Sequence, residues 1–267
     1  MGTTTAFERV DWYDDPESYD ILLEEDTDVE ARFLHELLER TFGPGPRDVL
    51  EPACGSGRLL EALAERGHRP MGIDLSQPML DYAADRLAAR GLSADLAHVS
   101  MESFRTRRRF DLAFCLVSSF RYLASERAAR THLQSVARAL RTGGLYVLGL
   151  HLTQYDWPGI QRERWVGERA GTRVVCNLQS WPPDPKRRLE KLRSRVTIER
   201  RGTRQRMETH WSFRTYDAAQ LKRLLRSVPA LEHVETYDFG YELDTPRELD
   251  DEQLDCVLIL RKRRGTG

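Results

Sequence analysis

The chain of 267 residues has no long apolar run and few cysteines, and each absence excludes a class of protein. No stretch approaches the roughly 18 apolar residues that a membrane-spanning helix needs, and the mean hydropathy is −0.57. Residues 1–5 lack the basic and apolar regions of a secretory signal, so we expect a cytoplasmic protein without a membrane partner. The cysteines lack the paired spacing of a disulfide framework or a zinc site, which indicates reduced thiols and no metal. They are Cys54, Cys115, Cys176 and Cys256.

Net charge is also nearly absent, because 41 lysine and arginine residues oppose 42 aspartate and glutamate residues. This sum hides opposed blocks. Residues 8–30 hold eleven acids and one base, whereas residues 162–206 hold fourteen bases and five acids. Such runs are commonly solvated faces. The alternative is that the acidic and basic segments pair with each other, or that the basic one covers an anionic substrate, and net charge does not choose between them.

From residue 47 onward, short apolar segments alternate with amphipathic ones, and turn residues separate them. The expected strands are 48–53, 69–74, 94–99, 110–117 and 145–152. The expected helices between them are 59–66, 77–90 and 125–140, with another at 29–40 before the first strand. A helix over 217–227, begun by a capping box, and strands near 232–239 and 254–263 follow. This order predicts an α/β fold with a doubly wound, mostly parallel, seven-stranded sheet.

The pattern changes after the fifth strand. Residues 173–179, 192–200 and 205–213 alternate polar and apolar side chains, which predicts a small three-stranded antiparallel sheet solvated on one face. We therefore expect four segments: a helical N-terminal arm, a core, an inserted β sheet and the rest of the core. Their bounds are 1–46, 47–158, 159–214 and 215–267.

The strongest chemical signal is the glycine-rich turn in residues 51–58, EPACGSGR, at the end of the first strand. Glycines in such a turn let backbone N–H groups approach a ligand. A dinucleotide fingerprint would need glycine where Leu60 stands, which argues against a nicotinamide or flavin enzyme. Asp74 ends the second strand, where a carboxylate can accept hydrogen bonds from both hydroxyls of a ribose. Alternatively, Asp74 or Ser76 caps the next helix.

With these residues the sequence resembles the class I S-adenosylmethionine-dependent methyltransferases, whose motifs it matches in order over residues 47–152. The resemblance implies a Rossmann-like fold and S-adenosyl-L-methionine as cofactor. Glu51 would then face the methionine part, Asp74 the ribose, and Met101 and Glu102 the adenine, although the family usually has Asp where Glu102 stands. The cofactor-binding residues that it implies are Tyr13, Tyr19, Glu51, Ala53, Gly55, Gly57, Arg58, Asp74, Leu75, Met79, Met101, Glu102 and Leu116.

Segments outside the core resemble one branch of this family. Tyr13 and the segment 18–20 resemble the aromatic arm that closes over the cofactor in small-molecule methyltransferases. The insert is similar to the substrate lid of sugar N-methyltransferases and glycine N-methyltransferases. Residues 118–123 resemble the loop that lines their acceptor pocket, with Tyr122 where some sugar enzymes carry histidine. The resemblance implies methyl transfer to nitrogen or oxygen of a small molecule, with nucleic acid not expected as a partner. The sequence leaves the oligomeric state, monomer or homodimer, open.

Methyl transfer from a sulfonium is an in-line displacement with a neutral leaving group, so alignment does much of the work. An amine must be unprotonated and a hydroxyl needs a base. Tyr122 after the fourth strand and His151 at the end of the fifth are the candidate catalytic residues, because ligands bind at the carboxyl ends of parallel strands. The alternatives are aromatic packing for Tyr122 and a hydrogen-bonded strand end for His151. Cys54 has no neighbouring histidine in sequence, so no catalytic thiol is expected.

Four tryptophans in or beside the insert either hold the small sheet together or, with Tyr155, form an aromatic wall over a substrate. They are Trp157, Trp165, Trp181 and Trp211. Two rival functions stay open: an RNA or protein methyltransferase that grips its target with the basic insert, and a non-catalytic cofactor-binding regulator. Residues 116–119 lack the Asn/Asp-Pro-Pro-aromatic signature of enzymes that act on base amines, and the arginines of the insert lie on both faces of its strands.

Overall fold

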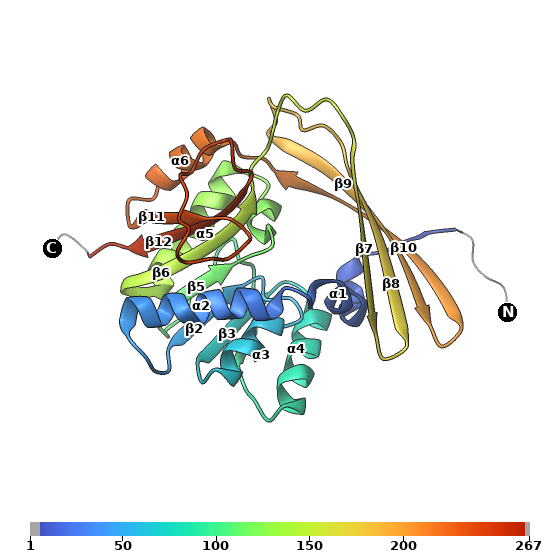
Figure 1. Cartoon of the computed structure of the whole chain (residues 1–267), viewed down its shortest axis with the longest axis horizontal. Coiled ribbons are helices and arrows are strands. Elements are labelled where there is room, and N and C mark those ends of the chain that lie inside the picture. The colour runs from blue at the N-terminus through green and yellow to red at the C-terminus, as the bar shows by residue number, and fades with distance from the viewer. Residues whose placement is uncertain (1–5, 265–267) are drawn as a thin grey trace.

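The structure is a computed structural model that describes residues 6–264, so the segment 1–5 discussed above lies outside the described residues. Two sheets make up the molecule (Figure 1). The larger sheet has seven strands in the spatial order β11 (Leu231–Tyr237), β12 (Asp255–Lys262), β6 (Leu140–His151), β5 (Phe110–Cys115), β2 (Asp48–Pro52), β3 (Arg69–Asp74) and β4 (Asp95–His98).

The larger sheet is mixed. The neighbours from β6 across to β4 pair in parallel, whereas β12 runs antiparallel to both β6 and β11. Every residue of β2 is buried, as expected for a central parallel strand that is covered on both faces. The predicted α/β, Rossmann-like fold is therefore confirmed, with one strand, β12, departing from the parallel arrangement.

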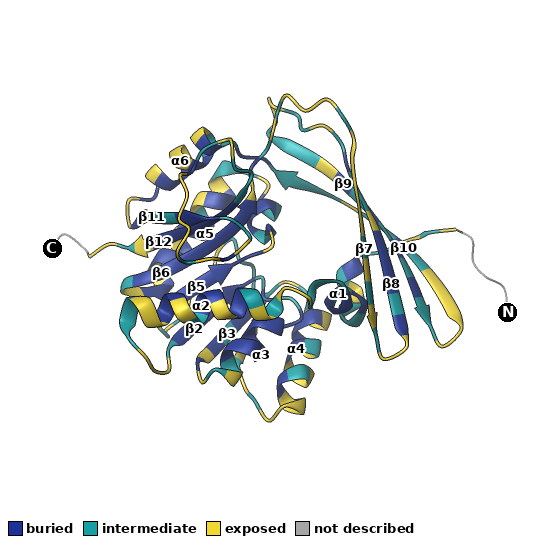
Figure 2. Cartoon of the chain, in the orientation of Figure 1, coloured by how far each residue is buried: buried dark blue, intermediate teal, exposed yellow. Residues whose placement is uncertain are grey.

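Helices cover both faces of this sheet and bury its central strands (Figure 2). On one face, α2 (Thr27–Phe42) and α3 (Arg58–Glu65) pack into one apolar core, to which α4 (Gln77–Ala89) contributes Leu80. On the other face, α5 (Glu126–Ala139) and α6 (Ala218–Arg226) pack into a second core. The predicted capping box is present, since Asp217 accepts a hydrogen bond from the Gln220 N–H and the Gln220 side chain accepts one from Asp217 N–H.

The smaller sheet, called here the second sheet, has the order β1 (Glu8–Arg9), β10 (Thr203–Arg214), β9 (Leu189–Arg200), β8 (Thr172–Ser180) and β7 (Gln161–Arg169). The three strands that the sequence predicts correspond to β8, β9 and β10. The predicted number of strands was wrong, because β7 and β1 also belong to this sheet. β7 was missed because its residues are mostly charged and exposed, so it lacks the apolar alternation of its neighbours. β1 comes from the N-terminus and pairs in parallel with β10, which no local pattern indicates.

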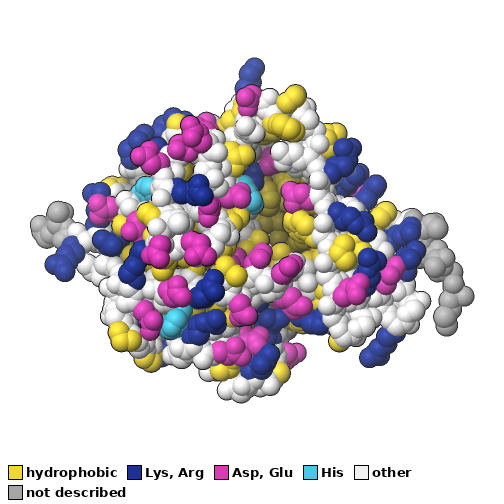
Figure 3. Space-filling view, in the orientation of Figure 1, with side chains coloured by type: hydrophobic (Ala, Val, Ile, Leu, Met, Phe, Trp, Pro, Cys, Tyr) yellow, Lys and Arg dark blue, Asp and Glu magenta, His cyan; other side chains and the backbone are white. Residues whose placement is uncertain are grey.

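The second sheet obtains its core from the N-terminal arm. The short helix η1 (Trp12–Asp14) and α1 (Pro16–Leu23) pack Trp12 and Ile21 against its inner face. Gly167 of β7 allows this close approach, because a Cβ there would lie 2.3 Å from the carbonyl oxygen of Ile21. In space-filling view the two sheets enclose a hollow between them (Figure 3).

The expectations for membrane-spanning helices and for the cysteines can be compared with residues 6–264. None of the helices in this part of the chain is long and apolar enough to cross a membrane. All four cysteines are buried and free of disulfides.

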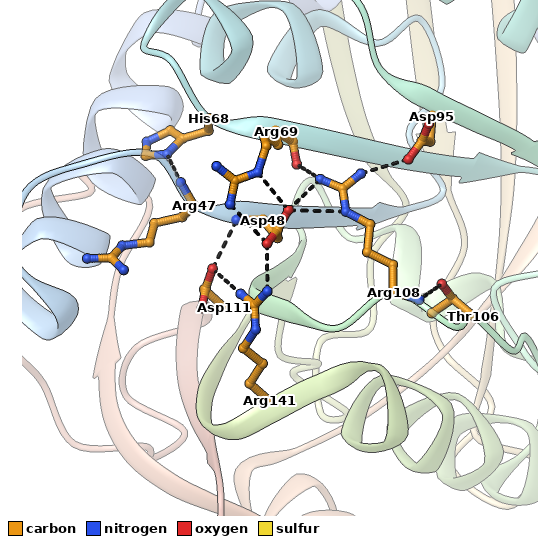
Figure 4. Close-up of polar contacts among 9 residues, drawn as sticks. All are labelled: Arg47, Asp48, His68, Arg69, Asp95, Thr106, Arg108, Asp111 and Arg141. Carbon is orange, nitrogen blue, oxygen red and sulfur yellow. Dashed lines mark hydrogen bonds and ion pairs between the residues drawn. The ribbon is translucent and has the colours of Figure 1, made fainter.

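A cluster of charged side chains fastens the amino ends of the central strands (Figure 4). Asp48, the first residue of β2, accepts hydrogen bonds from Arg69 of β3 (3.0 Å), from Arg108 before β5 (2.7 Å) and from Arg141 of β6 (2.7 Å). Asp111 pairs with Arg141 and accepts a 3.0 Å hydrogen bond from the Asp48 N–H. Hydrogen bonds from Arg69, Arg141 and Arg108 hold the pKa of Asp48 well below its ordinary value, although partial burial opposes them.

Replacing Asp48 by asparagine leaves three guanidinium groups without their shared carboxylate, and we expect it to lower the free energy of unfolding by about 2–3 kcal/mol near neutral pH. The folded-state pKa lies below the unfolded one, so the carboxylate stabilises the fold above about pH 4. That stabilisation is lost as pH falls through the folded pKa. Urea unfolding should therefore show the gap between the two proteins narrowing below about pH 4.

Asp95→Asn is the matched control, because Asp95 pairs with Arg108 at 2.7 Å but is largely exposed. Removing such a surface pair is expected to cost less than about 1 kcal/mol. Equal stability of the two variants at neutral pH would contradict a central role for Asp48.

Candidate cofactor and acceptor site

A cavity of about 700 Å³ lies between the two sheets. It opens above the carboxyl ends of β5 and β6, where Val117 and His151 line it. Hydrophobic side chains form the floor of the hollow, and acidic side chains lie at its rim (Figure 3). Pockets of this size and polarity hold small molecules.

The predicted glycine turn lies at the carboxyl end of β2, beside this cavity. Ala53, Gly55 and Gly57 all have positive φ, at 61°, 51° and 73°. Gly57 is required here, because a Cβ would lie 2.7 Å from the Cβ of Ala83 in α4. The N–H of Gly55 donates a 2.9 Å hydrogen bond to Asp74, which joins the ends of β2 and β3.

The structure decides which residue caps the helix after Asp74. The Ser76 hydroxyl accepts the 3.3 Å hydrogen bond from the Met79 N–H, so Ser76 is the N-cap of α4. Asp74 accepts from the Ser76 and Gly55 N–H groups, one on each carboxylate oxygen. Each oxygen can accept a further hydrogen bond. Beside it, the side chain of Leu75 is 66% exposed, which is unusual for a leucine and leaves an apolar surface next to the carboxylate.

Glu51 is buried in the same turn with one carboxylate oxygen, Oε2, that has no hydrogen-bond partner among the described residues. Burial raises the pKa of its carboxyl well above the usual range. Arg58 is engaged elsewhere, in an ion pair with Glu30 and a 3.0 Å hydrogen bond to Thr27 of α2. A buried acceptor without a partner is costly, so this position suits a cationic or N–H-donating group of a ligand.

The remaining predicted cofactor residues differ in exposure. Met101 is half-buried, and its carbonyl oxygen accepts a 2.7 Å hydrogen bond from His132, while Glu102 lies 3.6 Å from Arg127. Met79 and Leu116 are buried beneath the turn and strand ends. Which of these side chains contact a cofactor stays a prediction.

The aromatic side chains of the N-terminal arm lie over the glycine turn. The Tyr13 hydroxyl donates a 2.7 Å hydrogen bond to the Tyr122 hydroxyl, and the ring of Tyr19 lies 5.3 Å from that of Tyr13. Tyr19 also contacts the turn, since a Cβ on Gly55 would lie 3.8 Å from its ring. Burial raises the pKa of both Tyr13 and Tyr122. Both hydroxyls are therefore neutral near pH 7, which favours a positioning role for Tyr122 over that of a base.

Asp20 of α1 is fully buried and joins the arm to three other segments. It accepts hydrogen bonds from Ser56 of the glycine turn (2.7 Å) and from Tyr82 of α4 (3.2 Å), and it pairs with Arg86 of α4. Arg169 of β7 donates a fourth hydrogen bond at 2.6 Å. The acidic arm and the basic insert thus pair with each other, one of the two alternatives that their charge left open.

The loop after β5 carries backbone strain. Val117 and Ser118 have φ of 54° and 63°, a left-handed conformation that is unusual for a β-branched residue. Such strain clusters at functional sites. Further along the loop, Arg121 is buried, pairs with Glu190 of β9 and lies 4.8 Å from the ring of Phe213. This ion pair ties the loop to the second sheet, and nothing in the sequence pattern indicated it.

His151 ends β6 and makes a 2.6 Å contact through Nδ1 with Asp255 of β12. Both residues line the cavity. Sequence reasoning named His151 but missed Asp255, because only the pairing of two strands about a hundred residues apart brings them together. Tyr122 and His151 therefore reach the same cavity from different strand ends.

The tryptophans of the insert face the cavity, together with Trp12 of the arm. Trp12 and Trp211 lie 6.2 Å apart, and Trp211 packs edge-on against Phe213. Tyr155 is not among the lining residues, because its hydroxyl bonds to Thr215 (2.8 Å) and Gln220 (3.0 Å). The aromatic wall that the sequence suggested is thus made of tryptophans, without Tyr155.

Part of the chain is similar to known methyltransferases. Residues 49–144 match the model of a methyltransferase domain. An amino-sugar N,N-dimethyltransferase of Streptomyces venezuelae, dTDP-3-amino-3,4,6-trideoxy-alpha-D-glucopyranose N,N-dimethyltransferase, is 32% identical over 42% of this chain and 45% of its own. A ubiquinone biosynthesis O-methyltransferase of Aromatoleum aromaticum is 34% identical over 34% of this chain and 43% of its own. The chain spans about half the length of the curated relatives that it matches.

Solved structures share the fold over nearly the whole chain. The sugar N-methyltransferase KedS8 from Streptoalloteichus has a TM-score of 0.74 at 19% identity, covering 99% of this chain and 98% of its own. An S-adenosylmethionine-dependent methyltransferase from Clostridium acetobutylicum has a TM-score of 0.77 at 19% identity, covering 93% and 97%. The shared fold extends well beyond the matched domain. The glycine turn and Asp74 both lie within residues 49–144, the segment that matches the methyltransferase-domain model.

Proposed function

We propose that the chain is an S-adenosylmethionine-dependent methyltransferase that transfers a methyl group to nitrogen or oxygen of a small molecule. The observation that carries this proposal is the buried oxygen of Glu51 that has no hydrogen-bond partner among the described residues. It lies at the start of the glycine turn, in which the Gly55 N–H donates a hydrogen bond to Asp74. One buried acceptor for an amino group and one carboxylate at the end of the next strand match the two polar ends of this cofactor. When bound, S-adenosylmethionine supplies an electrophilic methyl group on a sulfonium.

The residues of the chain fit that cofactor in a definite order. Glu51 would accept hydrogen bonds from its α-amino group, and Asp74 would accept them from its ribose hydroxyls. The exposed side chain of Leu75 would be covered by the adenine, with Met101 on the other side. Each of these groups lies at the carboxyl end of a parallel strand or just after it, where ligands bind in open α/β sheets.

The arm and the second sheet would act as a lid. In this proposal the described part of the arm, residues 6–46, covers the cofactor and residues 159–214 cover the acceptor. Asp20 holds α1 on the glycine turn while Arg169 ties it to β7, so the two covers are fastened to each other. Such closure excludes water and aligns the acceptor with the methyl group, which supplies much of the barrier reduction for an in-line transfer. The four buried thiols suit the reducing cytoplasm.

A small acceptor suits the site better than a nucleic acid. The cavity is about 700 Å³ and is lined by tryptophans. The arginines of the second sheet are also largely engaged within the chain. Arg173 pairs with Glu168, Arg195 with Glu208 and Arg204 with Glu199. Arginines committed to carboxylates add little to the positive field that attracts phosphates, which disfavours the rival RNA methyltransferase.

Replacing Asp74 by alanine should weaken binding of S-adenosylmethionine about a hundredfold, because two hydrogen bonds to a charged group are lost. Isothermal titration calorimetry measures this directly. Asp74→Asn, which retains one carbonyl oxygen for the Gly55 N–H, separates loss of the turn from loss of the ligand contact. Asp85→Ala, an exposed acid on α4, is the control and should bind normally. Undiminished affinity in Asp74→Ala would remove the ribose assignment.

Replacing Glu51 by glutamine tests the other end of the cofactor. We expect about tenfold to hundredfold weaker binding of S-adenosylmethionine, since an amide, unlike a carboxyl group, cannot ionise to pair with an ammonium group. 5′-Methylthioadenosine lacks the amino-acid part, so its affinity should be unchanged in this variant but reduced in Asp74→Ala. Equal weakening of both ligands by Glu51→Gln would mean that Glu51 only shapes the turn.

The acceptor class can be found by measuring release of S-adenosylhomocysteine with a panel of amino sugars, sugar nucleotides, aliphatic amines and phenols. Bulk RNA and a mixed peptide pool form separate arms. We expect turnover with a small molecule and none with the polymers. Turnover with RNA alone would favour the rival function, and cofactor binding without any turnover would favour a regulatory protein.

A further inference from the structure

The pair formed by His151 and Asp255 has a geometry that the proposed function does not yet use. The two residues are directly opposite each other in the antiparallel ladder between β6 and β12, at its last rung. Opposed residues point to the same face of a sheet, and a slip by one residue would turn Asp255 to the other face. The strand register therefore places a carboxylate against this imidazole at the edge of the cavity.

The imidazole of His151 is held from several sides. Nδ1 contacts the Asp255 carboxylate at 2.6 Å, the ring of Phe239 lies edge-on at 4.8 Å, and the backbone N–H donates to the Ser118 hydroxyl at 3.3 Å. Ser118 belongs to the strained loop after β5, so His151 is fastened to the part of the cavity nearest that strand. Nε2 makes no hydrogen bond or ion pair with any residue between 6 and 264, and it is the ring nitrogen available to a ligand.

The ion pair between His151 and Asp255 adds little to the stability of the fold. The side chains of His151 and Asp255 are 48% and 43% exposed, and ion pairs so exposed contribute less than about 1 kcal/mol. The chain has a second exposed pair of the same kind, in which Nε2 of His210 lies 2.7 Å from Glu208 on β10. His210 does not line the cavity, which makes it a matched reference.

We infer that Asp255 positions His151 as the proton acceptor for the methyl acceptor, with Nδ1–H donated to the carboxylate and the Nε2 lone pair free. This inference rests on the proposed function. A carboxylate on one ring nitrogen fixes the tautomer and stabilises the imidazolium that forms. Asp255 is then a positioning residue, because it acts only through His151.

The methyl group and one proton move in this step. A lone pair of the acceptor nitrogen or oxygen forms a bond to the methyl carbon, while the carbon–sulfur bond breaks and its electron pair stays on sulfur. The proton that the acceptor loses passes to Nε2 of His151. The imidazolium is stabilised by the Asp255 carboxylate and returns the proton to solvent at the open side of the cavity.

The tautomer of His151 tests the inference without any methyl transfer. Long-range ¹H–¹⁵N spectra of the full chain resolve the two ring nitrogens, and His151→Gln identifies the signals. We expect the Nδ1–H tautomer at about pH 8 in the unaltered protein, and a shift toward Nε2–H in Asp255→Asn, because water favours that form once the carboxylate is gone. His210→Gln should leave the signals unchanged. An Nε2–H tautomer in the unaltered protein, or one that Asp255→Asn does not alter, would overturn the inference.

Kinetics with whichever panel compound turns over fastest supplies a second readout. His151→Gln should lower kcat about a hundredfold, the scale of general base catalysis, and Asp255→Asn about tenfold or more. Neither should change the KM for S-adenosylmethionine or the melting temperature, which a merely structural role would alter. Unchanged kcat in both variants would overturn the inference while leaving the methyltransferase assignment intact. Absence of turnover with every compound counts against the proposed function instead, and the tautomer result then stands alone.

Discussion

The enclosure of the site depends on one buried carboxylate, that of Asp20. Ser56, Tyr82, Arg86 and Arg169 converge on it from the glycine turn, from α4 and from β7. A fully buried carboxylate is costly unless several donors satisfy it, and removing its partners costs about 3–5 kcal/mol. The arm, the glycine turn and the second sheet therefore have one arrangement in which this charge is satisfied. That arrangement creates the cavity.

The amino and carboxyl edges of the larger sheet differ in how far their polar groups are paired. At the amino edge, Asp48 of β2 forms ion pairs with three guanidinium groups, which come from β3, from the segment before β5 and from β6. These ion pairs hold the amino ends of the strands together. At the carboxyl edge, polar groups are left with unused hydrogen-bonding capacity, in Asp74 and Glu51, and the backbone is strained at Val117. The charges of the amino edge are thus paired with each other, whereas unsatisfied and strained groups, which are typical of functional sites, gather at the carboxyl edge.

Much of the fold, together with the conformation of the glycine turn and the place of Asp74, could be predicted from the sequence, because their signals are local. The glycine turn, the strand-end Asp74 and the caps of the helices each depend on residues within a few positions of one another. The cavity wall around His151 and Arg121 depends on contacts between distant segments. Asp255 reaches His151 only through the register of β12 on β6, and Arg121 reaches Glu190 only once the second sheet has folded over the core. β7 carried no apolar alternation, because most of its residues are charged and exposed.

The near-zero net charge reflects the pairing of the acidic arm with the basic second sheet. Acids of the arm face bases of the second sheet, as in Arg169 with Asp20 and Glu24, and Arg200 with Glu17. Only the Asp20 pair is fully buried on its acidic side, so the outer pairs are screened by salt while the inner one is not. The outer pairs therefore add to the contacts between the arm and the second sheet, whereas the buried network and the apolar contacts of Trp12 and Ile21 fix their relative position. The opposed charge blocks thus join the arm to the second sheet beside the cavity that the tryptophans line.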